Sequence, residues 1–81
     1  VEPFQLEIQG MLGDLKGRLT ARGVPFDTRV GLFDMTQLAS RSTTERAAAY
    51  NYDFIAGDGS LGMHNPIYVV NLLAASISAL P

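Results

Sequence analysis

The chain has 81 residues and contains no cysteine. This absence excludes disulfides, thiolate zinc sites, thiol nucleophiles and iron–sulfur clusters built by this chain. It also excludes covalent attachment of haem by the chain itself, because that attachment uses a Cys-x-x-Cys-His motif. His64 is the single histidine, and one imidazole cannot form a zinc site alone.

Charged residues are also scarce. Six basic and eight acidic residues give a net charge of -2, and charged residues make up 17% of the chain, below the usual quarter. The acidic balance and the lack of a basic cluster argue against nucleic-acid binding. No apolar run reaches about 18 residues, so we expect no membrane span. Because few charges are available to cover a small domain, we also expect an apolar surface that faces a persistent partner.

The mass of 8.7 kDa limits the chain to one small domain, or a fragment of a larger one. Surface scaling predicts about 4,700 Å² of exposed surface after folding, with roughly 62% of the unfolded surface buried. Such a core is modest and leaves no room for a deep enclosed pocket. Because the sequence begins at Val1 and not at methionine, we expect a processed protein or a fragment.

The first half of the sequence predicts a helix followed by a wrapping linker, over residues 1–41. Apolar residues recur at helical spacing between Pro3 and Arg22, and Gly23 is suited to the position after a helix. Three glycines lie on another flank of this helix, where they either weaken it or allow a backbone or a flat ring to approach closely: Gly10, Gly13 and Gly17. Residues 24–41 read as irregular, with a short helical turn near residues 33–39. This length is unusual for a connection and suggests that it wraps a larger body.

Two further helices are predicted, giving an all-α fold of about three helices over residues 3–22, 43–56 and 66–80. Ser42 and Glu45 form a capping-box pattern before the second helix. Asn65 and Pro66 are typical of the N-cap and first position of the third. The third helix is apolar on most sides and no residue after His64 is charged, so we expect it to be buried on most sides. Two short neighbouring helices can scarcely cover it, so we expect an absent partner to cover the rest.

Several familiar sites are excluded by spacing. Asp53 and Asp58 do not continue into the alternating ligands of a calcium-binding EF-hand loop, and no Gly-Lys-Ser/Thr phosphate loop is present. The glycines at positions 57, 59 and 62 follow a predicted helix and not a strand, which argues against dinucleotide binding. No pattern pairs a nucleophile with a base. We therefore do not expect an independent enzyme.

His64 lies at the end of a glycine-rich loop, directly before the cap of the third helix. A lone histidine is often structural or simply exposed to solvent. This position also projects an imidazole outward from a fixed helix start, and one histidine is sufficient for one axial position of a haem iron. Asn65 or a backbone carbonyl could orient the ring and leave Nε2 free for a metal.

The second half of the chain resembles a known group of proteins. Residues 49–55 (AYNYDFI) and 58–68 (DGSLGMHNPIY), with the core His64-Asn65-Pro66-x-Tyr68, are similar to the C-terminal segment of multihaem c-type cytochromes. That broad group is similar to cytochrome c nitrite reductases and hydroxylamine oxidoreductases. The match covers about Thr44 to Leu80, so residues 42–81 are interpreted as a cytochrome-like helix-loop-helix.

The resemblance implies an electron-transfer module in the periplasm or outside the cell. It implies that His64 is the distal axial ligand of a haem c that another chain or segment holds covalently. It further implies that four other residues line the haem edge, although each has an alternative role in an ordinary helical core: Tyr50, Tyr52, Phe54 and Met63.

Three accounts follow from a haem-ligand pattern without a haem-attachment motif. The chain is a C-terminal piece of a longer cytochrome, or a subunit that donates His64 to a partner's haem, or a helical interaction subunit without haem that docks through its apolar last helix. We therefore expect an obligate complex, in which the partner is a haem-bearing cytochrome chain or the missing part of the same protein.

Overall fold

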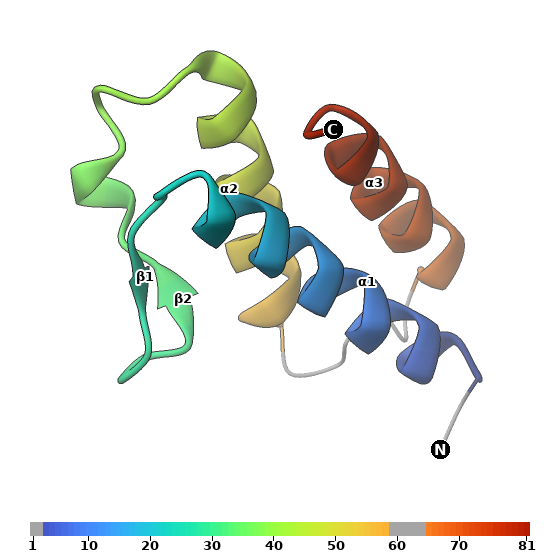
Figure 1. Cartoon of the computed structure of the whole chain (residues 1–81). Helices are drawn as coiled ribbons and strands as arrows, with labels where there is room; N and C mark the ends of the chain where they lie inside the picture. The colour runs from blue at the N-terminus through green and yellow to red at the C-terminus, as the bar shows by residue number, and fades with distance from the viewer. Residues whose placement is uncertain (1–2, 59–64) are drawn as a thin grey trace.

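The computed structural model describes residues 3–58 and 65–81, and it confirms the predicted all-α class (Figure 1). The helices of these residues are α1 (Pro3–Ala21), α2 (Thr43–Ala56) and α3 (Pro66–Ser78). Between α1 and α2 lie β1 (Phe26–Asp27), β2 (Leu32–Phe33) and a short 3₁₀ helix, Met35–Gln37. The helix starts agree with prediction, and the ends differ by at most two residues.

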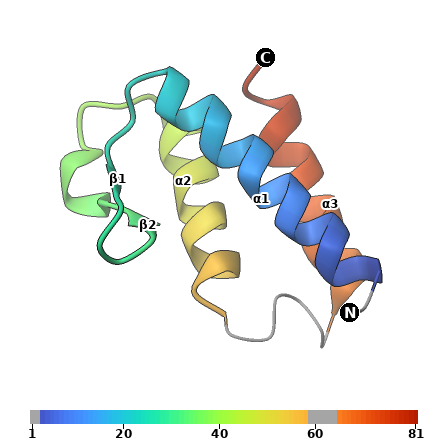
Figure 2. The ribbon, with the colours of Figure 1, turned by 60° about the horizontal axis from the view of Figure 1, so that its bottom comes forward.

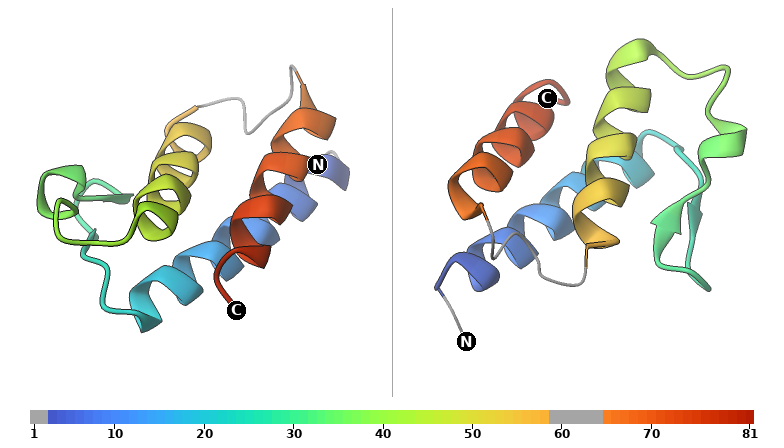
Figure 3. Two further views of the ribbon diagram at one scale, coloured as in Figure 1. Left: turned by 90° about the horizontal axis from the view of Figure 1, so that it is seen from above. Right: turned by 180° about the vertical axis from the view of Figure 1, so that it is seen from behind.

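α2 and α3 lie side by side and run in opposite directions, and α1 crosses both of them (Figures 1 and 2). Seen from behind, α2 passes in front of the C-terminal part of α1, and α3 lies beside α1 (Figure 3). The core forms where the three helices meet. Its fully buried large side chains come from all three helices, from the segment before α2 and from the residues after α3: Ile8, Leu15, Leu19, Leu38, Ile55, Leu73 and Leu80. The exposed surface of 4795 Å² is close to the value expected for this mass.

The C-terminus of α1 is closed by a glycine turn. Gly23 has φ of +84°, its N–H donates to Thr20 O at 2.9 Å, and the N–H of Val24 donates to Leu19 O at 3.1 Å. These two bonds form a Schellman motif, which needs a residue in the left-handed region and favours glycine there. The Arg41 guanidinium donates to the carbonyl oxygens of Arg22 and Gly23. The helix end predicted from Gly23 is therefore confirmed.

A small antiparallel hairpin, which the sequence reading did not predict, occupies part of residues 24–41. Phe26 pairs with Phe33 in register, and the turn between the strands closes at Gly31, which has φ of +80°. Asp27 accepts a hydrogen bond from Arg29 N at 2.9 Å, as in an Asx turn. The predicted short helical turn is confirmed as the 3₁₀ helix Met35–Gln37.

The starts of α2 and α3 have the predicted caps. Ser42 Oγ accepts from Glu45 N at 3.1 Å, and Ser42 N donates to Glu45 Oε1 at 3.4 Å, which completes the capping box. Asn65 Oδ1 accepts from Tyr68 N at 3.3 Å, with Pro66 at the first helical position. These caps hold the two helices on either side of the glycine-rich loop.

Candidate functional site

The predicted haem ligand His64 and its neighbour Met63 lie outside the described residues, so only the helix ends before and after them are described. On one side α2 ends at Ala56, with Gly57 as C-cap and its N–H donating to Asp53 O at 2.9 Å. On the other side Asn65 caps α3. Both flanks lie at the same end of the molecule (Figure 1).

Tyr50 and Phe54 form an exposed aromatic pair on α2. Their side chains are one helical turn apart, their ring centroids are 6.5 Å apart and their planes differ by 5°. Tyr50 is 60% exposed and Phe54 58% exposed, which is unusual for rings of this size. The pair therefore presents two exposed, parallel aromatic rings in the second half of α2.

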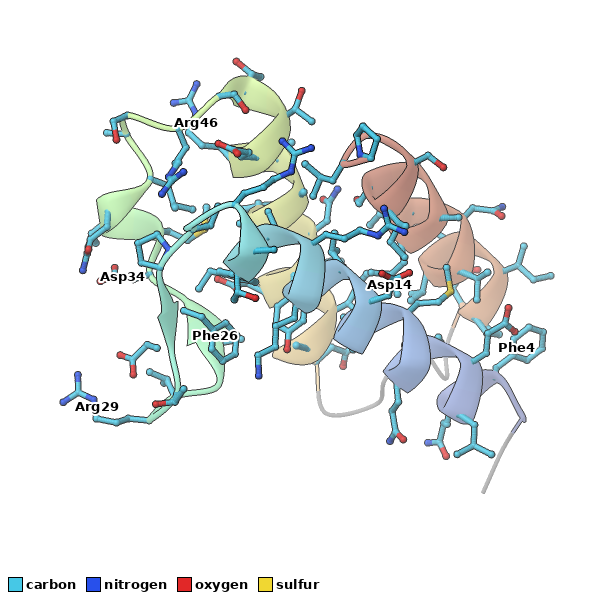
Figure 4. The ribbon with its side chains drawn as sticks, viewed as in Figure 1. Phe4, Asp14, Phe26, Arg29, Asp34 and Arg46 are labelled. Carbon is cyan, nitrogen blue, oxygen red and sulfur yellow. The ribbon has the colours of Figure 1, made fainter. Side chains whose placement is uncertain are left out.

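Tyr52 lies on the opposite side of α2 and packs inside the molecule. Its ring contacts Phe33 edge to face, with centroids 5.1 Å apart, and Phe26 at 5.9 Å. Figure 4 shows Phe26 projecting from the hairpin toward the helices, while Arg29 projects away from the turn. Burial raises the pKa of the Tyr52 hydroxyl, with a smaller contribution from the charge of Asp53. The structure thus brings Tyr50 and Phe54 together and separates Tyr52 from them.

α3 is only partly buried by the other helices of this chain. Its buried side chains are Val69, Leu73 and Ser76, whereas Ile67 and Tyr68 are more than half exposed. The two neighbouring helices thus leave part of α3 uncovered in the described chain, as expected from their short length, and cover by a partner stays a prediction. The uncovered side is free of charged residues.

A shallow groove of about 320 Å³ runs between α2 and α3. Most of its lining residues have small side chains, and none of them is charged: Thr43, Thr44, Ala47, Ala48, Asn51, Leu72, Ala75, Ser76 and Ala79. Asn51 Nδ2 donates to Ser76 Oγ at 3.0 Å, and Ser76 Oγ donates to Leu72 O at 2.9 Å. The polar side chains that bridge the groove are therefore already partnered.

The three glycines of α1 face open space. A Cβ built on Gly10, Gly13 or Gly17 would meet no heavy atom of the described residues within 4 Å, apart from the helix's own backbone and the adjacent residues. The close approach suggested by their spacing is thus not made within the described chain.

Carboxylates gather at the hairpin without forming a metal site. Asp53 Oδ1 accepts from Phe33 N at 2.8 Å, which ties α2 to β2, and burial raises the pKa of Asp53 even though this hydrogen bond opposes the shift. Hydrogen bonds from Thr36 and Gln37 lower the pKa of Asp34. Over residues 3–58 and 65–81, no group of three His, Cys, Asp or Glu side chains is placed to hold a metal ion.

Comparison of the chain with protein-family models, with curated proteins and with solved structures finds no match. Within the described part of the chain, no helix combines the length and the apolar character needed to cross a membrane. The candidate site is therefore defined by the geometry of the described residues: the capped end of α2 and the capped start of α3, the exposed aromatic pair on α2 and an uncharged groove between the two helices.

Proposed function

We propose that this chain is a helical docking module of a multihaem cytochrome assembly. It presents His64 as the distal axial ligand to a haem c that is attached to another chain or segment. The observation that carries the docking part is the uncovered side of α3, a helix of 13 residues without a single charge. Solvent-exposed helices normally carry charged or polar residues on the outer face, so an uncharged outer face favours a bound partner.

The haem part of the proposal is supported by the motif and its surroundings. The residue that follows His64 in the sequence, Asn65, caps the start of α3, and this capped start belongs to the motif that carries the resemblance. The parallel rings of Tyr50 and Phe54 are exposed on α2, the helix that precedes the motif, where they could contact a haem edge. A bound haem would supply one-electron redox chemistry, and a second imidazole ligand would leave no open position on the iron.

The second candidate is a haem-free interaction subunit that docks through α3. It is favoured by the same uncharged side of α3, where Ile67 and Tyr68 are exposed, and it needs no role for His64. In this case the complex is colourless, or every haem in it finds both axial ligands elsewhere. Removal of residues 65–81 then abolishes assembly without changing the ligation of any haem.

Optical spectra of the purified complex distinguish these candidates. We expect His64→Ala to convert one haem from low-spin to high-spin absorption and added imidazole to restore the low-spin bands. Arg46→Ala serves as control, because Arg46 is an exposed residue of the first half of α2, away from the loop (Figure 4). Unchanged low-spin bands in His64→Ala would show that this histidine is not the ligand and would favour the haem-free candidate.

A further inference from the structure

Two arginines of α1 hold the residues that follow α3. Arg18 Nη1 donates to Leu80 O at 2.8 Å, and Arg22 Nη2 donates to Pro81 O at 3.2 Å. We call these two contacts the arginine clamp. A helix C-terminus carries partial negative charge, so guanidinium groups are favoured beside it. The Leu80 side chain is also fully buried. The C-terminal end of α3 is therefore anchored both by packing and by charge-assisted hydrogen bonds.

The arginines of the clamp are themselves paired with carboxylates. Arg18 Nε donates to Asp14 Oδ1 at 2.8 Å, one turn earlier on α1. Arg22 Nη1 lies 3.7 Å from Glu45 Oε2, and Glu45 also belongs to the capping box of α2. Charges that form a network contribute more than isolated surface pairs do. The clamp thus links the end of α3 to the end of α1 and to the start of α2.

The polar ties of α3 to the other helices are confined to one end. Asn51 Nδ2 of α2 donates to Ser76 Oγ at 3.0 Å, in the last turn of α3. Over the described residues, the side-chain hydrogen bonds that α1 and α2 make to α3 and the residues after it all reach Ser76 or beyond. Val69 and Leu73 pack inside the molecule, whereas Ile67 in the first turn is 65% exposed. Apolar packing alone therefore holds the first half of α3 within the described chain.

We propose that α3 is hinged at its C-terminal end, so that its first turn separates from the other helices more often than its last turn does. Segments with exposed side chains and few ties open locally at a lower free energy than anchored segments. The end that opens is the end that follows His64 in the sequence. Its consequence rests on the proposed function: the start of α3 adjusts to the haem-bearing body while the clamp keeps the helix on the module.

Amide hydrogen exchange of the 81-residue chain, followed by NMR, tests the hinge. The amides compared are hydrogen-bonded within the backbone at opposite ends of α3: Val69 N to Asn65 O at 3.2 Å and Ala79 N to Ala75 O at 3.1 Å. Both ends of an unanchored helix fray. We expect the Ala79 amide to be protected about tenfold or more over that of Val69, as one charge-assisted hydrogen bond would give. Equal protection at the two ends, or the reverse order, would overturn the proposal.

Removal of the clamp provides the second measurement. Arg18→Met keeps an apolar stem and removes the guanidinium, and Arg46→Met is the control, because Arg46 is exposed on α2 and outside the clamp. We expect Arg18→Met to speed exchange at Ala79 about tenfold and to leave Val69 unchanged, while Arg46→Met alters neither amide. Equal acceleration at both ends would show that α3 opens as one unit and would overturn the hinge.

The comparison of the two ends in the unchanged chain needs no variant, so it decides the matter even where Arg18→Met lowers overall stability. The exchange is measured without haem, and His64→Ala should leave the difference between the two ends unchanged. A failed haem assignment and a failed hinge are therefore observed separately.

Discussion

Replacing the outward glycines of α1 by alanine is expected to stabilise the isolated chain. Gly10, Gly13 and Gly17 lie in the interior of a regular helix, and a Cβ at each position contacts nothing beyond that helix and the adjacent residues. Glycine is less favourable than alanine in such positions by about 1 kcal/mol. The three positions share no partner, so the triple variant should gain about 3 kcal/mol. A gain of 1 kcal/mol raises Tm by about 4–8 °C in a domain of this size.

Thermal and urea unfolding followed by circular dichroism measure this effect. Gly23→Ala is the matched control, because Gly23 has φ of +84° and a Cβ there would lie 3.2 Å from Arg41 Nη2. We expect that variant to lose stability by more than about 1 kcal/mol. The reasoning is refuted if the α1 variants are destabilised, since the helix would then not have the open outer face described above.

Three further predictions concern the fold. Leu15→Ala changes a fully buried position and should lower the free energy of unfolding by about 2–5 kcal/mol. Leu6→Ala, on the exposed side of the same helix, should change it by less than about 0.5 kcal/mol. Urea titration compares the two variants, and equal losses of stability would contradict the assigned core. Ser42→Ala removes one half of the capping box and should cost about 1 kcal/mol in the same assay, so an unchanged urea midpoint would argue against the cap. Burial raises the pKa of Asp53, so the folded state binds the carboxyl proton more tightly than the unfolded state does. The contribution of Asp53 to stability therefore falls as pH rises from 3.8 through the folded pKa. Asp53→Asn should remove that decrease, and a pH profile of stability identical to that of the unchanged protein would contradict the raised pKa.

The helices could be predicted because each is encoded locally. The Ser42–Glu45 box, the Asn65–Pro66 start and the Gly23 stop act within a few residues of the backbone groups that they satisfy. The hairpin depends on contacts far apart in the sequence. Phe26 and Phe33 meet Tyr52 of α2, and such contacts are not visible as a local period. Gly31 was the available signal, because a glycine closing a short turn is typical of a hairpin.

The candidate site could be predicted only in part for a related reason. Helical periodicity places Tyr50 and Phe54 on one face and Tyr52 about 200° away, so the sequence could have separated the exposed pair from the core tyrosine. The exposure of α3 depends on how many neighbours the chain supplies. The apolar pattern of α3 predicts that the helix is covered, and because this chain offers only two short helices as neighbours, the sequence already indicates that they leave part of it exposed.

The structure of the assembled complex tests the central claim most directly, through the distance from His64 Nε2 to the nearest iron. The account predicts a separation of about 2 Å, typical of imidazole–metal bonds, with the thioether bonds of that haem on another chain or segment. An imidazole that contacts no iron, in a complex whose haems are all ligated by other residues, would contradict it.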